Sequence, residues 1–98
     1  VDDRIAPLVA SASRLRELDL SWTRCGEPTV RSIGNRSTIE TLWLTGSQVS
    51  DTSVPSLLQM DSLQSLDVQR TKISNAGLAK LKRGLPAVKI NPLQLRLQ

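Results

Sequence analysis

Residues 63–73 read LQSLDVQRTKI, and the pattern of this stretch occurs twice more in the chain. Residues 15–25 read LRELDLSWTRC and residues 39–49 read IETLWLTGSQV. In each stretch the first, fourth and sixth positions are apolar, and the ninth is Thr or Ser. The eleventh position is Cys in the first stretch and an aliphatic residue in the other two. The three starts, at positions 15, 39 and 63, are equally spaced. A fixed period of this kind indicates a chain built from stacked structural repeats, each of which buries its apolar side against its neighbours.

Each repeat is predicted to contain a short strand and then a helix. The alternating apolar and polar residues at the fourth to sixth positions favour a strand. The second half has apolar residues three apart after a polar residue, as in Asp51, Val54 and Leu57, which favours a capped amphipathic helix. Pro55 lies in the first turn of this helix, so we expect it to be short or of the 3-10 type. A helix that returns the chain between successive strands requires those strands to be parallel.

The two ends depart from this pattern. Residues 3–12 have apolar residues on one helical face and no strand before them, so a helix either covers the first repeat or the chain starts within a repeat. Near the other end we predict a degenerate fourth start at Val88, one position later than the period would place it, which puts Asn91 at a leucine position. Residues 93–98 alternate like an edge strand. Because the first residue is not Met, we expect the chain to be a segment of a longer protein.

The prediction is therefore one α/β domain over residues 1–98. We expect a right-handed solenoid with a parallel sheet of three to four strands on its concave face and helices on its convex face. Its units are a half repeat 1–14, full repeats 15–38, 39–62 and 63–87, and a degenerate end 88–98.

The repeated pattern resembles the leucine-rich repeat consensus, with Thr or Ser where many families have Asn. Residues 71–81, TKISNAGLAKL, resemble the TxIT/SDxGLxxL unit of bacterial leucine-rich repeat proteins. Those proteins are similar to the ribonuclease-inhibitor-like and cysteine-containing subclasses, which have a helix in each unit. The resemblance covers roughly residues 3–91. It implies the fold and leaves the function open.

The composition argues against an enzyme. The 98 residues include no histidine and a single cysteine, Cys25. The commonest general base and metal ligand is therefore absent, and neither an internal disulfide nor a multi-cysteine metal site can form. We predict no catalytic residue, no metal and no cofactor. No apolar run approaches the roughly 18 residues of a membrane span, and the compartment is left open.

The net charge of +4 raises the question of a nucleic-acid partner. Several basic residues, however, are predicted to lie on helices and return loops, where Lys80, Lys82 and Arg83 suit the carboxyl end of a helix. The basic residues are not interleaved with aromatic ones that could stack on bases. We therefore do not expect nucleic acid as the partner.

Two sets of reactive side chains have structural explanations. Thr23, Ser47 and Thr71 follow the predicted strands, where a hydroxyl can bond nearby backbone groups, and no base is at hand to make it a nucleophile. Cys25 takes the same position as apolar residues in the later repeats, so we expect a buried thiol.

The outward positions of the strands form the candidate binding surface for another protein. Stacking in register places Trp43 between Asp19 and Asp67. Tryptophan is enriched at interface hot spots, and a large apolar side chain on an outward position calls for a reason. The alternative is that Trp43 covers its neighbours and stabilises the sheet. The two carboxylates would be about 9–10 Å apart with no cleft between them, which does not fit a catalytic pair. The predicted site residues are Trp43, Asp19, Asp67, Glu17, Trp22 and Arg70.

We expect the function to be protein–protein interaction through the concave sheet face. Four strands about 4.8 Å apart expose on the order of 200–300 Å² there, against about 800 Å² per partner in a standard interface. Further repeats or the rims of the sheet would have to contribute, or this segment is one end of the stack. Two alternatives stay open. One is a substrate receptor or regulatory appendage of a larger signalling or ubiquitin-ligase-type protein. The other is a basic surface that binds an anionic polymer.

Overall fold

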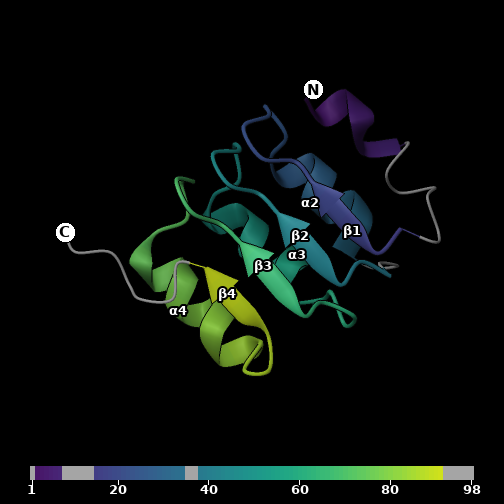
Figure 1. Cartoon of the computed structure of the whole chain (residues 1–98). Helices are drawn as coiled ribbons and strands as arrows, with labels where there is room; N and C mark the ends of the chain where they lie inside the picture. The colour runs from purple at the N-terminus through teal and green to yellow at the C-terminus, as the bar shows by residue number, and fades with distance from the viewer. Residues whose placement is uncertain (1, 8–14, 35–37, 92–98) are drawn as a thin grey trace.

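The computed structural model describes residues 2–7, 15–34 and 38–91. Within these ranges four parallel strands form one sheet in chain order (Figure 1). The strands are β1 (Glu17–Asp19), β2 (Thr41–Trp43), β3 (Ser65–Asp67) and β4 (Lys89–Asn91). The prediction of an α/β chain with a parallel sheet is confirmed.

Helical segments separate the strands, and α2 and α3 lie behind the sheet in the view of Figure 1. The helical segments are η1 (Asp3–Ile5), α2 (Glu27–Gly34), η2 (Asp51–Ser53), α3 (Val54–Leu57) and α4 (Asn75–Gly84). The short helix predicted around Pro55 is confirmed, because a 3-10 turn there leads into only four α-helical residues. The helix predicted over residues 3–12 is described only in its first part, and the alternating residues 93–98 lie outside the described residues.

The strands pair in a constant register that equals the period of the sequence repeat. Leu18 pairs with Leu42, Leu42 with Leu66, and Leu66 with Ile90. The predicted slip of one position at Val88 is therefore wrong, because Ile90 takes the leucine position and Asn91 pairs with Asp67. The physical reason is burial: Ile90 is only 3% exposed, and a slip of one residue would turn an asparagine amide inward instead.

One continuous aliphatic core forms from the repeated apolar positions of the strands and helices. Cys25 and Val49, which share a repeat position, are both fully buried, so the prediction of a buried thiol is confirmed. Leu57 and Leu81 from the helices join the same cluster. Burial of each such side chain contributes about 1.5–3 kcal/mol, so the stacked layers supply the main stabilisation.

Carboxylates at two helix starts tie one repeat to the next. Oδ1 of Asp3 accepts hydrogen bonds from the Gly26 amide at 2.8 Å and the Thr29 hydroxyl at 2.7 Å. Asp51 accepts hydrogen bonds from the Ser74 amide at 2.8 Å and from the Ser74 hydroxyl at 2.7 Å. These bonds place a negative charge beside the start of the following helix, where amide groups otherwise lack partners.

Hydroxyl groups after β1 and β3 close the turns as predicted, but the one after β2 does not. The Thr23 hydroxyl donates to the Leu20 carbonyl at 2.7 Å, and the Thr71 hydroxyl donates to the Val68 carbonyl at 2.7 Å. Ser47 is buried, and its hydroxyl has no hydrogen-bond partner among the described residues. The prediction of a backbone bond is therefore wrong for Ser47.

These two situations predict opposite mutational effects. Thr71→Val keeps the shape of the side chain but removes a buried hydrogen bond, so we expect the free energy of unfolding to fall by about 1–2 kcal/mol. Ser47→Ala removes a buried hydroxyl without a partner, so we expect stability to be unchanged or higher. Urea unfolding followed by circular dichroism measures both. Equal losses in the two variants would show that Ser47 is bonded after all.

Candidate functional site

The middle residues of the candidate surface form one row across three strands. Asp19 pairs with Trp43, and Trp43 pairs with Asp67. Adjacent strands lie about 4.8 Å apart, so the two aspartates flank the tryptophan on the same side of the sheet. The predicted row is thus present, and the register of β4 adds Asn91 to its end.

Trp43 lies between two buried residues in the sequence but remains accessible itself. Leu42 and Leu44 on either side of it are fully buried, whereas Trp43 is 36% exposed. Strand alternation explains the contrast between Trp43 and Leu42, because successive side chains point to opposite faces. The covered part of the indole fits a role in stabilising the sheet, and the exposed part leaves room for a ligand.

Both aspartates bond to the loop that follows their own strand. Oδ1 of Asp19 accepts from the Ser21 amide, and Oδ1 of Asp67 accepts from the Gln69 amide, each at 2.9 Å. The Gln69 side-chain amide also donates to Oδ2 of Asp67 at 3.2 Å. The Ser21 amide bond lowers the pKa of Asp19 because it favours the ionised form. The sequence reasoning missed this turn role, although an Asp two residues before a turn amide is a known local signal.

The rim beyond the strands has a left-handed backbone at one position of each of the first three repeats. Trp22, Gly46 and Arg70 have φ angles of 60°, 69° and 56°. The indole of Trp22 lies over Gly46, because a Cβ on that glycine would overlap the ring. Trp22 is nevertheless 69% exposed. The predicted rim residues Trp22 and Arg70 therefore both have a strained backbone conformation that residues other than glycine rarely adopt.

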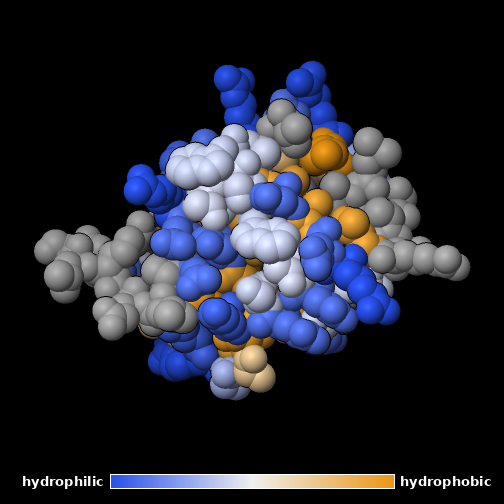
Figure 2. Space-filling view, in the orientation of Figure 1, coloured by the Kyte–Doolittle hydropathy of each residue, from blue (hydrophilic) through white to orange (hydrophobic). Residues whose placement is uncertain are grey.

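Charges separate between the sheet face and this rim. Acidic residues on outward strand positions are Glu17, Asp19 and Asp67, and the outward basic residue is Lys89 on β4. The rim has the exposed basic residues Arg24, Arg70 and Lys72. Figure 2 shows the strand side mainly in hydrophilic blue and near-neutral pale colours, with orange apolar areas near β1. The face around Trp43 is therefore polar and acidic.

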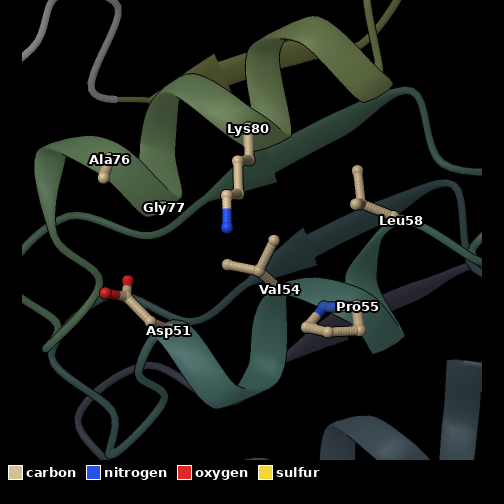
Figure 3. A pocket seen from close by; sticks show the side chains of 7 residues that line it. All are labelled: Asp51, Val54, Pro55, Leu58, Ala76, Gly77 and Lys80. Carbon is tan, nitrogen blue, oxygen red and sulfur yellow. The ribbon is translucent and has the colours of Figure 1, made fainter.

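A groove on the helix side was not predicted. It lies between α3 and α4 and has a volume of about 320 Å³. In Figure 3 the Lys80 amine points into the gap toward Val54, and the Asp51 carboxylate lies at one side. The lining residues are Asp51, Val54, Pro55, Leu58, Ala76, Gly77 and Lys80. Gly77 packs closely against the Asp51 carboxylate, because a Cβ there would overlap Oδ1 of Asp51, and contacts of this kind between helices are not visible in the sequence.

The described residues offer neither a metal site nor a membrane span. No three His, Cys, Asp or Glu side chains in the described part of the chain gather closely enough to hold a metal ion. No helix described in residues 2–7, 15–34 or 38–91 has both the length and the apolar character needed to cross a bilayer. No protein-family model matches the chain, and no curated protein matches it either.

The contact between Trp22 and Gly46 predicts a coupled pair. Gly46→Ala should lower the free energy of unfolding by about 1–2 kcal/mol because alanine is strained in the left-handed backbone of this position. A further loss is expected because the new Cβ would overlap the Trp22 indole, which must then move. In a Trp22→Ala background only the backbone cost should remain. A double-mutant cycle by urea unfolding measures the difference. An equal cost of Gly46→Ala in both backgrounds would show that the ring does not lie there.

The bond from Ser21 predicts the titration of Asp19. Because its folded-state pKa is lowered, its contribution to stability is complete above the ordinary aspartate pKa and is lost as the pH falls through the lowered value. A carbon-13 NMR titration of the Asp19 carboxyl group should give a lower pKa in the folded protein than in urea. Identical titrations in the two states would rule out the bond in solution.

Proposed function

We propose that the chain is a leucine-rich repeat solenoid and that its sheet face binds another protein. The constant register supports the repeat assignment, because each strand position recurs one sequence period later through all four strands. Residues that recur in this way would stack as repeats do. The sheet would form the concave side and the helices the convex side.

The observation that carries the binding proposal is the placement of Trp43. Its indole is 36% exposed on a sheet face whose other outward residues are polar. Because most of Trp43 is already covered in the free protein, its indole loses less freedom when a partner covers the rest, so it can contribute strongly to affinity. Asp19 and Asp67 flank it, and the Asp19 carboxylate is held in place by its own turn.

Glu17, Trp22 and Arg70 extend this surface toward its edges. Trp22 adds a second exposed ring on the rim, and Arg70 lies at the same repeat position two units later. The sheet face alone is on the order of 200–300 Å², so a partner would also contact this rim to approach a standard interface. We propose a binding role and no catalytic one, because each aspartate is engaged by its own loop.

A random peptide library displayed on phage tests the proposal without a known partner. Peptides selected on the wild-type protein are compared on Trp43→Ala and on a matched control, Gln59→Ala, which alters an exposed residue after α3. We expect Trp43→Ala to weaken binding at least about tenfold and to shift the melting temperature little, as expected for a hot spot. Gln59→Ala should bind like the wild type. Unchanged binding with a strongly lowered melting temperature would instead assign Trp43 to sheet stability.

A further inference from the structure

We infer that the segment bound on the sheet face places the cationic side chain of a lysine or arginine on the Trp43 ring, between Asp19 and Asp67. This inference rests on the proposed function and adds the chemistry of the partner. A peptide with one cationic residue at that place is the occupant that the charges of the face select.

The geometry of the row supports a cation at this place. The face of an indole is electron-rich and attracts ammonium and guanidinium groups within about 6 Å of the ring centre. Asp19 and Asp67 lie on the two strands next to Trp43. Each strand step is about 4.8 Å, so a cation above the ring would have a strand that carries a carboxylate on either side. The aromatic face and the two carboxylates therefore all favour a positive charge at this place.

The carboxylates are fixed by their own loops and have no charged partner in the part of the chain that the structure describes. Among the described residues, neither Asp19 nor Asp67 pairs with a cationic side chain. The Ser21 amide donates to Oδ1 of Asp19, and Gln69 holds both oxygens of Asp67 through its backbone and side-chain amides. These bonds already restrict the side chains, so a ligand would not have to immobilise them.

The surrounding charges limit how basic the partner is. Glu17 adds to the negative charge near β1, whereas Lys89 on β4 opposes it. On the rim, Arg24, Arg70 and Lys72 would repel a uniformly basic segment. A single lysine or arginine flanked by polar or acidic residues fits both regions. Neither a polycation nor a polyanion fits them together.

The phage selection provides the test, with three additions. The first is the composition of the Trp43-dependent peptides, which should contain Lys or Arg at one shared position. The second is the double variant Asp19→Asn/Asp67→Asn, whose asparagine oxygens can still accept the two turn amides. The third is a synthetic selected peptide with its shared residue replaced by citrulline or leucine.

We expect the double variant to bind the synthetic peptide about five- to tenfold more weakly than the wild type, since two charge contacts are lost. On the wild-type protein, the citrulline peptide should bind more weakly than the unmodified peptide by a similar factor. On the double variant, the two peptides should bind almost equally. Asp61→Asn removes one exposed carboxylate from the loop before β3 and should leave binding unchanged. Raising the salt concentration should weaken the wild-type complex more than the double-variant complex.

The possible failures are distinct. Trp43-dependent peptides without a shared Lys or Arg would overturn the cation inference and leave the proposed function standing. Basic peptides that bind equally well to Trp43→Ala would also overturn it, because the cation would then lie elsewhere. The absence of any Trp43-dependent peptide would overturn both. Nuclear magnetic resonance spectra of each variant confirm that it is folded before its binding is compared.

Discussion

The in-register burial of one aliphatic side chain per strand is the constraint on which the rest of the structure depends. Leu42 and Leu66 are fully buried in this column, and Ile90 closes it at β4. Because side chains alternate along a strand, the burial of this column decides which residues face outward. Trp43 lies beside Asp19 and Asp67 only because its neighbour Leu42 is aligned with the leucines of the adjacent strands.

Polar side chains reinforce this stacking at the helix starts and in the turns after the strands. Asp51 reaches the start of the next helix through Ser74. After the strands, Asp19 and Asp67 each hold a turn that leads into a left-handed residue. The repeat with Trp43 in the aspartate position has Gly46 at that turn, where a left-handed backbone costs little. The middle repeat can therefore present an indole where the other two need a carboxylate.

The repeat period was sufficient to predict the parallel sheet, the buried Cys25 and the short helix at Pro55, because these follow from apolar spacing and proline geometry. It failed at β4, since Val88 resembles a new start and spacing alone does not include the cost of burying Asn91. The row around Trp43 was predicted, whereas the turn bonds of Asp19 were not. The groove between α3 and α4 could not be predicted, because it depends on how two helices pack.

The register brings Trp43 between two aspartates on one accessible face. Nuclear Overhauser effects between backbone protons test it directly in solution, since they report which residues are opposite each other on neighbouring strands. We expect cross-strand contacts from residue 42 to residues 18 and 66, and from residue 43 to residues 19 and 67. Contacts shifted by one residue along any strand would contradict it, because that slip would turn the side chains of that strand to the opposite face.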